Sequence, residues 1–185
     1  MDPLRISELS RPETRRLFFA LWPEEGLRQQ LYELAKQSLK ANTGRRVAAE
    51  NMHLTLAFLG SVAEADQTRY EAAASGVRGR TFTLTLDQLG CFRRSGIFWI
   101  GPQRVPAELL SLVRELNQAL QACGFTPEPR EYRAHLTLAR DVRRCPERAM
   151  GLSPISWVVR HFAMVQSHTE SHGATYEILR RWELG

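Results

Sequence analysis

Two stretches of five residues are identical in this sequence: His53-Leu54-Thr55-Leu56-Ala57 and His135-Leu136-Thr137-Leu138-Ala139. They lie 82 positions apart in a chain of 185 residues, which is close to half its length. An acidic residue precedes each copy by three or four positions, Glu50 in one case and Glu131 in the other. This repeat predicts a two-lobed fold in which each lobe contributes one equivalent strand.

The repeat gives each strand one polar face, because successive side chains of a strand point to opposite faces. His53 and Thr55 share one face, and the leucines of the repeat share the other. His135 and Thr137 have the same relation. We expect each strand to bury its leucines and to present an imidazole and a hydroxyl outward. If the lobes pack with pseudo-two-fold symmetry, two histidines and two threonines meet in one cleft.

Two imidazoles and two hydroxyls in one cleft favour chemistry at phosphorus. Imidazoles can serve as a general base and a general acid in one step near pH 7. Hydroxyls can donate hydrogen bonds to the non-bridging oxygens of a bound anion. The set predicts an in-line displacement in which one histidine deprotonates the nucleophile and the other protonates the leaving oxygen, with no metal. A zinc site is the alternative, but these strands carry no Cys, Asp or Glu at ligand spacing.

The remaining elements are predicted from apolar periodicity and from turn residues. Strands are expected over 15–22, 53–59, 81–89, 97–100, 135–139, 157–166 and 175–182, and helices over 24–39, 64–74 and 106–123. Strands and helices interleave, and several strands are neighbours in sequence, with 97–100 expected to pair with 81–89. We therefore predict an α+β fold with two pseudo-symmetric lobes of mainly antiparallel sheet and outer helices around a central cleft.

The predicted domain organisation is a single catalytic domain over 1–185, to which the two lobes contribute the strands 53–56 and 135–138. Residues 1–14 are polar and broken by two prolines, and they are expected to form a loose leader. No apolar run approaches the roughly 20 residues of a membrane helix, and the N-terminus lacks the pattern of a secretion signal. These features predict a cytoplasmic protein that does not partner a membrane.

The charge is basic and is carried almost entirely by arginine. The net charge is +5, with 23 Arg against 2 Lys. Arginine is well suited to phosphate, because its planar fork donates two parallel hydrogen bonds. A GC-rich genome also favours arginine codons, so composition alone leaves open whether the partner is a polyanion.

The three cysteines suggest neither a disulfide framework nor a zinc knuckle. Cys91, Cys123 and Cys145 are an odd number without a C-x-x-C spacing. Cys123 continues the apolar stripe of the helix 106–123 and is expected to be a small buried hydrophobic residue. A reducing cytoplasm fits this usage.

The paired His-x-Thr motifs resemble the two signatures of the 2H phosphoesterase superfamily. Their flanks narrow the resemblance to bacterial RNA 2′,3′-cyclic phosphodiesterases, formerly called 2′-5′ RNA ligases. The similar segments are RLFFALW at 16–22, NMHLTLAFLG at 51–60, HLTLAR at 135–140 and the pattern Gly173-Ala174-x-Tyr176-x-x-Leu179-x-x-Trp182. The resemblance extends from about Arg16 to Leu184. Similar sequences often read His-Pro-His before the second motif, where this chain has Arg133-Ala134-His135.

The resemblance implies hydrolysis of a terminal RNA 2′,3′-cyclic phosphate to a 2′-phosphate without metal or cofactor. It implies that His53 is the proton donor to the leaving 3′ oxygen and that His135 is the acceptor that activates water. Thr55 and Thr137 would hold the phosphate oxygens, and Arg140 would lie near the phosphate. On an ideal strand Arg140 has the opposite parity to His135, so we expect it past the strand end or on a bend.

Other residues are weaker candidates, each with a structural alternative. Phe18 either stacks on a terminal base in the cleft or belongs to the core, and Tyr132 is a similar candidate. The pairs at 45–46 and 143–144 either guide an RNA backbone or are solvated charges. His161, His168 and His172 are expected on the surface or in a loop.

The sequence leaves two alternatives to this function: another substrate for the same chemistry, and RNA binding without catalysis. The same chemistry can act on another small cyclic nucleotide or on a 2′-5′ oligonucleotide, and reverse ligation to a 2′-5′ linkage is allowed by microscopic reversibility. A non-catalytic RNA-binding module is the alternative outside enzyme chemistry. The expected partner is RNA or an oligonucleotide with a 2′,3′-cyclic phosphate end, bound by a monomer.

Overall fold

The computed structural model describes residues 14–40, 43–146, 152–170 and 173–185. The strands are β1 (Thr14–Leu21), β2 (Arg45–Arg46), β3 (Leu54–Ala63), β4 (Phe82–Leu86), β5 (Gln88–Phe92), β6 (Ile97–Gly101), β7 (Leu136–Arg140), β8 (Ile155–Val159), β9 (His161–Glu170) and β10 (Gly173–Glu183). The helices are α1 (Glu25–Ser38), α2 (Glu64–Ser75) and α3 (Ala107–Gln121), with the short 3-10 helix η1 (Ala49–Asn51). The predicted α+β class is confirmed, and each predicted helix is present.

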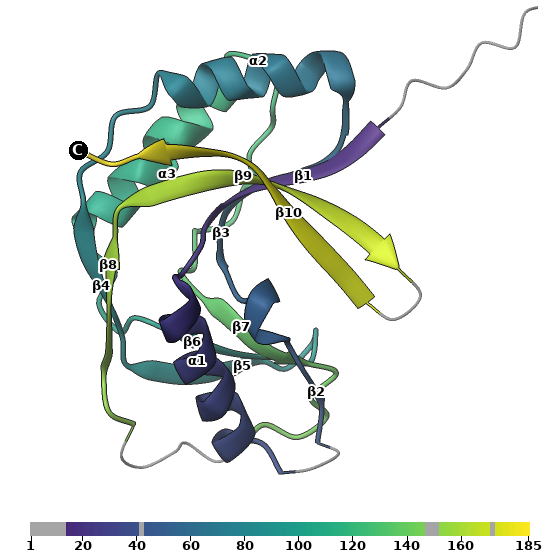
Figure 1. Cartoon of the computed structure of the whole chain (residues 1–185), viewed down its shortest axis with the longest axis vertical. Helices are drawn as coiled ribbons and strands as arrows, with labels where there is room; N and C mark the ends of the chain where they lie inside the picture. The colour runs from purple at the N-terminus through teal and green to yellow at the C-terminus, as the bar shows by residue number, and fades with distance from the viewer. Residues whose placement is uncertain (1–13, 41–42, 147–151, 171–172) are drawn as a thin grey trace, which may run out of the picture.

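An eight-stranded antiparallel sheet forms the frame of the molecule (Figure 1). Its strand order is β10-β9-β1-β3-β7-β6-β5, with β2 beside β7, and β4 and β8 form a separate pair. We call β10, β9, β1 and β3 the first half of this sheet, and β2, β7, β6 and β5 the second half. The ladder between β3 and β7 consists of the pair Leu54–Leu136, so the two copies of the repeat meet where the halves join.

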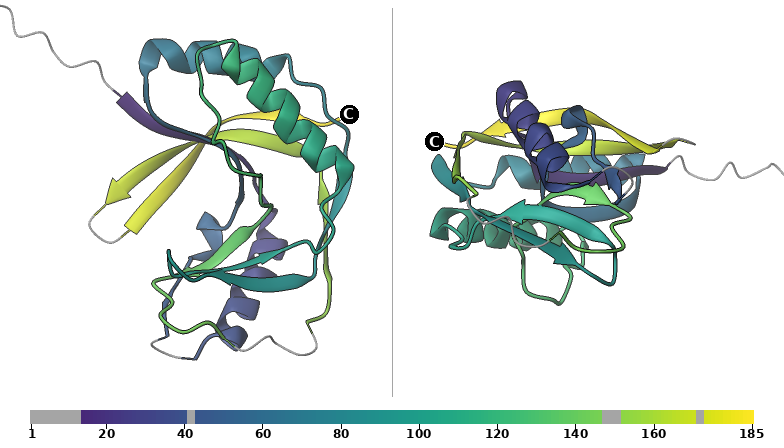
Figure 2. Two further views of the ribbon diagram at one scale, coloured as in Figure 1. Left: turned by 180° about the vertical axis from the view of Figure 1, so that it is seen from behind. Right: turned by 90° about the horizontal axis from the view of Figure 1, so that it is seen from below.

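The helices tie the two halves together. Helix α1 follows β1 of the first half but packs against β7 and β2 of the second half. Helix α3 follows β6 of the second half but packs against β3 of the first half and against α2. Figures 1 and 2 show α2 and α3 at the end of the molecule opposite α1. The chain therefore crosses between the halves more than once, and neither half is a continuous segment.

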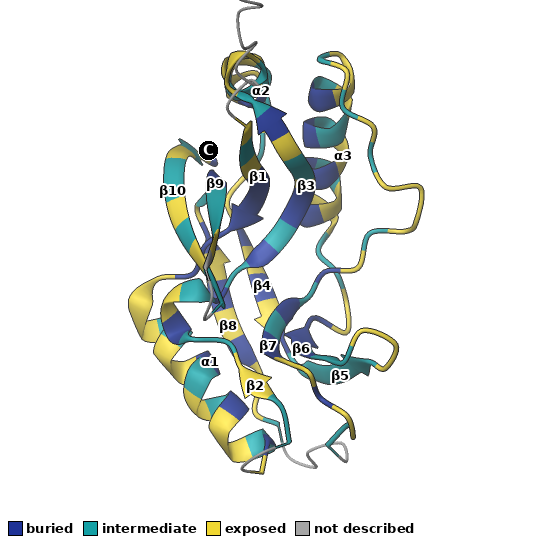
Figure 3. Cartoon of the chain, turned by 90° about the vertical axis from the view of Figure 1, so that its right-hand side faces the viewer, coloured by how far each residue is buried: buried dark blue, intermediate teal, exposed yellow. Residues whose placement is uncertain are grey.

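The core follows the apolar periodicity of the sequence. One stripe of α3 is buried, and it consists of Leu109, Leu112, Val113, Leu116 and Leu120. Strands β4 and β8 alternate between buried and exposed residues along their length (Figure 3). Among the described residues, no helix has both the length and the apolar character that crossing a membrane requires.

The two copies of the repeat have the same local structure, including a β-bulge at the same position. Thr55 lies opposite Ala20 and Ala57 opposite Phe19 on β1, so Leu56 is an additional residue in the ladder. Thr137 lies opposite Trp99 and Ala139 opposite Phe98 on β6, so Leu138 is additional there. Both copies bury two consecutive residues, Leu56-Ala57 and Leu138-Ala139. A bulge shifts the alternation of side chains by one residue.

The bulges resolve the parity of Arg140. Arg140 and Phe58 each stand five positions after the histidine of their copy, and both are exposed. Beyond the bulge, residues of the opposite parity face the same side as the threonine. Arg140 is the last residue of β7 and so lies within the strand rather than past its end. The bulge at Leu138 is the irregularity that changes its parity.

Two predicted long strands are each divided by a change of sheet. The predicted strand 81–89 breaks at Asp87, whose carboxylate accepts a hydrogen bond from the Gln103 amide at 2.7 Å. The part before the break pairs with β8, and the part after it pairs with β6, so the expected pairing of 97–100 holds only for β5. The predicted strand 157–166 breaks at Arg160, whose carbonyl accepts a hydrogen bond from the Leu184 amide.

Two further predictions about the chain are wrong in part. Thr14, expected in the loose leader, is the first residue of β1, and the rest of the leader lies outside the described residues. The segment 45–46, for which no strand was predicted, forms β2 beside β7. A strand of two exposed arginines has no apolar periodicity that sequence reasoning could detect.

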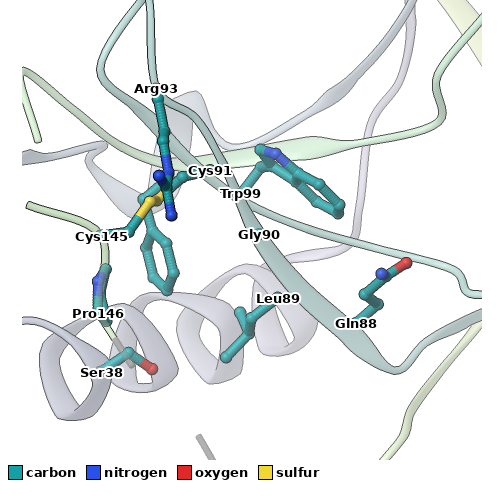
Figure 4. Close-up of a pocket in the computed structure, with 10 residues that line it drawn as sticks. Ser38, Gln88, Leu89, Gly90, Cys91, Arg93, Trp99, Cys145 and Pro146 are labelled. Atoms are coloured by element: carbon teal, nitrogen blue, oxygen red, sulfur yellow. A yellow bond between two sulfur atoms is a disulfide. The ribbon is translucent and has the colours of Figure 1, made fainter. Parts of the chain in front are cut away.

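The prediction for the cysteines is also wrong. A disulfide joins Cys91 on β5 to Cys145, with their Cα atoms 6.1 Å apart. Figure 4 shows this bond beside a pocket of about 500 Å³ that Pro146 and Trp99 also line. Cysteines 54 positions apart give no local sequence signal of pairing. Cys123 is half-buried rather than buried, and it lies two residues beyond Gln121, the last residue of α3.

Candidate active site

A cavity of about 620 Å³ opens where the two halves of the sheet join, and strands β1, β2, β3, β7, β9 and β10 all contribute to its wall. Most of the predicted site residues line it, namely Phe18, His53, Thr55, Thr137 and Arg140. His135 immediately precedes β7 and lies close enough to His53 for its charge to lower the pKa of that imidazole. The structure therefore brings the predicted residues together from segments far apart in the sequence.

Three aromatic rings surround His53, which immediately precedes β3. Its ring stacks on Trp22 at a centroid distance of 5.2 Å and an interplanar angle of 5°. Phe18 and Tyr176 lie at 4.8 Å and 5.0 Å. Burial lowers the pKa of His53 from 6.5 to about 4, and the charges of Arg140 and His135 act in the same direction. Burial opposes the charged form because it replaces water around the imidazolium.

His135 occupies the equivalent position in the second half but is more open. Phe92 meets its ring edge-on at 4.9 Å, and Trp99 lies at 6.5 Å. Burial lowers the pKa of His135 as well, and the charges of Arg140 and Arg130 add to this effect.

The two histidines have the same tautomer for the same reason. Nδ1 of His53 lies 2.8 Å from the Asn51 carbonyl oxygen, and Nδ1 of His135 lies 2.7 Å from the Arg133 carbonyl oxygen. A carbonyl oxygen only accepts hydrogen bonds, so Nδ1 carries the proton in both rings. In the neutral state each Nε2 therefore carries a lone pair that can accept a proton, which is what a general base requires. When protonated, the same nitrogen becomes a donor.

The cavity is strongly basic. Its lining includes Arg16, Arg45, Arg46 and Arg140, and no Asp or Glu is among its described lining residues. Arg45 is paired with Asp141 at 3.4 Å, next to the end of β7. Four guanidinium groups around two threonine hydroxyls favour a phosphate anion. The pair at 45–46 thus lies at the cleft, whereas Arg143 and Arg144 are exposed away from its lining.

The structure favours a different aromatic residue for stacking on a base. Phe18 lines the cavity but is only 3% exposed, and its ring packs against His53. Phe58 is 43% exposed on the same wall. Of the two, Phe58 therefore offers the free ring surface for a base. Sequence reasoning missed Phe58, although its place five residues after His53, matching Arg140 in the other copy, is visible in the repeat.

Tyr132 makes a structural contact, and the additional histidines that the structure describes lie on a strand. Tyr132 is part-buried, and its hydroxyl donates a hydrogen bond to the Thr55 carbonyl oxygen. His161 and His168 were expected on the surface or in a loop, and both lie on β9. The side chain of His168 is 43% exposed and pairs with Glu177 of β10 at 3.3 Å. His172 lies outside the described residues.

Across the part of the chain that the structure describes, no group of three or more His, Cys, Asp or Glu side chains is arranged to hold a metal ion.

Comparisons with known proteins place the chain in a family. Residues 23–170 match the model of the 2′-5′ RNA ligase superfamily. The RNA 2′,3′-cyclic phosphodiesterase of Escherichia coli K12 is 33% identical over 176 residues, which cover 93% of this chain and 98% of that protein. The protein of the same name from Archaeoglobus fulgidus is 30% identical over 91% of this chain and 99% of its own length.

Solved structures show the same fold. The crystal structure of E. coli LigT complexed with 3′-AMP superposes with a TM-score of 0.82 at 34% identity, covering 93% of this chain and 99% of that one. A fold shared over nearly the full length, the doubled histidine motif and the family match lead to one conclusion. This chain belongs to the 2′-5′ RNA ligase superfamily.

Proposed function

We propose that this chain is an enzyme that hydrolyses the 2′,3′-cyclic phosphate end of RNA to a 2′-phosphate. The observation that carries the proposal is the matched pair of histidines beside a cavity lined by arginines. Each histidine has Nδ1–H on a carbonyl oxygen, which leaves Nε2 as the nitrogen that can take or give a proton. The relatives named RNA 2′,3′-cyclic phosphodiesterase, which align over nearly the whole chain, support the same substrate.

The cyclic phosphate binds as an anion between Thr55, Thr137 and Arg140. Nε2 of His135 takes a proton from a water molecule, and the water oxygen attacks phosphorus. The bond from phosphorus to the 3′ oxygen breaks on the opposite side. Nε2–H of His53 gives its proton to that oxygen, which leaves as a hydroxyl. The product keeps the phosphate on the 2′ oxygen, and proton exchange with solvent resets both imidazoles.

His53 needs a proton at the start of this step, although burial lowers its pKa to about 4. The bound phosphodiester supplies the compensating charge, because an anion beside an imidazole favours the imidazolium form. The rings of Phe18, Trp22 and Tyr176 keep the imidazole of His53 in the same orientation in both protonation states. His53 therefore becomes protonated, and can act as an acid, mainly when the substrate is bound.

The terminal nucleoside lies on the first half of the sheet in this proposal. The leaving 3′ oxygen belongs to its ribose and is next to His53, so the sugar and base must lie on the His53 side. Phe58 of β3 then provides a face for the base, and stacking of this kind contributes about 1–3 kcal/mol. Phe18 acts through His53 rather than on the base.

Reverse ligation follows from the same site when a ribose hydroxyl replaces water as the nucleophile. Water is present at a far higher concentration than any RNA end, so hydrolysis is the dominant direction. Because both histidines come from one chain, we propose that the two halves act as lobes of a single catalytic domain in a monomer that needs no cofactor. A cytoplasmic location suits an RNA substrate, and the Cys91–Cys145 bond would there face a reducing thiol pool.

A panel of cyclic substrates tests the proposal. RNA with a 2′,3′-cyclic phosphate end, nucleoside 2′,3′-cyclic phosphates, 3′,5′-cyclic nucleotides and 2′-5′ oligonucleotides are incubated with the protein, with and without EDTA. The expected product is a 2′-phosphate from the 2′,3′-cyclic ends, unaffected by EDTA. Exclusive turnover of another class, or loss of activity on chelation that added metal restores, would contradict it. RNA binding without turnover, unchanged in the double histidine variant, would indicate a binding module.

A further inference from the structure

We propose that Arg16 binds the phosphodiester on the 5′ side of the terminal nucleotide, so that the site prefers the end of an oligonucleotide to a cyclic mononucleotide. This inference rests on the proposed function and deepens it, because it specifies the length of RNA that the cavity recognises. Nothing in the chemistry of the cyclic phosphate itself requires Arg16.

Arg16 is placed apart from the other cavity arginines. Arg45 and Arg46 on β2 and Arg140 on β7 all belong to the second half of the sheet, on the side of His135. Arg16 on β1 is the cavity arginine of the first half, on the side of His53. The ribose of the leaving group must lie on that side. The phosphodiester on the 5′ side of this ribose therefore lies over the half of the sheet that carries Arg16.

The position of Arg16 along the strands fits a group one step away from the reacting phosphate. Phe18 lies opposite Phe58, whereas Arg16 lies opposite Ser61 and further from His53. Two residues along a strand correspond to about 6.6 Å. The guanidinium carbon of Arg16 lies 4.9 Å from the centroid of the Phe58 ring, so it borders the surface proposed for the base.

The guanidinium of Arg16 is available for a ligand. Within the described ranges, no carboxylate lies within ion-pair distance of it, whereas Arg45 is bound to Asp141. A guanidinium stacked on a ring keeps its N–H edges free for a phosphate, which it can bind through two parallel hydrogen bonds. Ser167, opposite Arg16 on β9, and Thr169 line the same part of the cavity and offer hydroxyl donors.

Arg15 provides a matched control. It precedes Arg16 on the same strand, yet its guanidinium donates to Glu64 at 3.3 Å and to Gln67 at 3.4 Å on α2. The two neighbouring arginines carry the same charge and point to different partners. Any effect of net charge alone would therefore appear in both variants.

The test compares three substrates that end in the same nucleoside. These are adenosine 2′,3′-cyclic phosphate, its 5′-phosphorylated form, and the dinucleotide ApA with a 2′,3′-cyclic phosphate end. The measured quantity is kcat/KM of each 5′-phosphorylated substrate divided by kcat/KM of adenosine 2′,3′-cyclic phosphate. This ratio cancels effects on the chemical step, including any movement of Phe58.

Both ratios are expected to exceed one in the unmodified protein and to fall roughly ten-fold in Arg16→Ala, the scale of a charged hydrogen bond to phosphate. The ratios of Arg16→Lys should lie between those of the unmodified protein and those of Arg16→Ala. Arg15→Ala should have the same ratios as the unmodified protein. Loss of the contact should also lower the dependence of the dinucleotide reaction on salt concentration. Ratios near one in the unmodified protein, or ratios unchanged in Arg16→Ala, would overturn the assignment.

Two other outcomes are informative in the same way. Preference for the dinucleotide without preference for the 5′-phosphorylated mononucleotide would place the contact on the upstream nucleoside and would also overturn it. If the unmodified protein hydrolyses none of the three substrates, the proposed function fails, and this assignment fails with it.

Discussion

The hydroxyl of Tyr132 donates a hydrogen bond of 3.0 Å to the main-chain oxygen of Thr55. The two residues are 77 positions apart. Thr55 belongs to the first copy of the repeat, and Tyr132 lies just before the second copy. Tyr132 precedes His135 by three residues, and Thr55 follows His53 by two. This contact therefore joins the backbone next to one histidine to the backbone next to the other, beside the Leu54–Leu136 pair.

Replacing Tyr132 by Phe should loosen this junction while keeping the ring. The carbonyl of Thr55 then loses its partner in a half-buried place, which costs about 1–3 kcal/mol of unfolding free energy. We expect kcat to fall several-fold and KM to change little, because the hydroxyl positions the histidine segments and touches no substrate. Denaturant unfolding and steady-state kinetics measure both effects.

Tyr70→Phe is the control for Tyr132, since Tyr70 lies on α2 away from the cavity. That variant should change the unfolding free energy by less than about 0.5 kcal/mol. Equal stability of Tyr132→Phe and the unmodified protein, with unchanged kcat, would show that the hydrogen bond does not position the site.

Gly101 is the glycine whose substitution should disturb His135 most. A Cβ atom at Gly101 would stand 2.5 Å from the Ala134 carbonyl oxygen, which is backbone and cannot turn aside as a side chain would. Gly101→Ala must therefore displace the segment that ends in His135. We expect a loss of about 1–3 kcal/mol in unfolding free energy and a fall in kcat.

Gly26→Ala is the matched control, because a Cβ there meets no atom within 4 Å. Alanine in a helix is more favourable than glycine, so this variant should be neutral or slightly stabilising and fully active. Thermal unfolding and turnover of both variants compare them directly. A Gly101→Ala protein as stable and active as Gly26→Ala would contradict the close packing at Ala134.

The pH dependence of kcat/KM should be bell-shaped with a maximum below pH 6.5. Burial lowers the pKa of His53 to about 4 and also lowers the pKa of His135 below 6.5. The reactive form needs His53 protonated and His135 neutral. Activity falls above both values because His53 loses its proton, and below both because His135 gains one. The maximum lies between the two macroscopic values.

Two further measurements test whether the charges around the histidines set this pH profile. The maximum of kcat should lie at higher pH than that of kcat/KM, because the bound anion raises the pKa of His53. Arg140→Gln removes a positive charge that lowers both pKa values, so its kcat/KM profile should move to higher pH at reduced activity. A maximum of kcat/KM above pH 7, or no movement in Arg140→Gln, would contradict the electrostatic account.

Much of the site could be predicted because the repeat is a local signal. Alternation along a strand placed His53 and Thr55 on one face, and the duplication brought in His135 and Thr137. In the structure His53, Thr55 and Thr137 line one cavity. The helices were predictable as well, because their apolar stripes repeat at the helical period.

The missed features depend on contacts between distant segments. Neither bulge is visible in the sequence, because Leu56 and Leu138 become additional residues only against the registers of β1 and β6. The exposure of Phe58 follows from that bulge, so the base was assigned to Phe18 instead. The break at Asp87 and the Cys91–Cys145 bond likewise depend on partners far away in the chain.

The central claim is that His53 protonates the 3′ oxygen and His135 activates water. Its most direct test is kcat/KM of the unmodified protein, His53→Ala and His135→Ala on RNA ends whose cyclic phosphate has either oxygen or sulfur at the 3′ position. With oxygen, both variants should lose at least ~10²-fold. A thiolate leaves without a proton donor, so His53→Ala should regain most of its activity with sulfur, and His135→Ala should not. Equal impairment of His53→Ala on both substrates, or rescue of His135→Ala instead, would contradict the assignment.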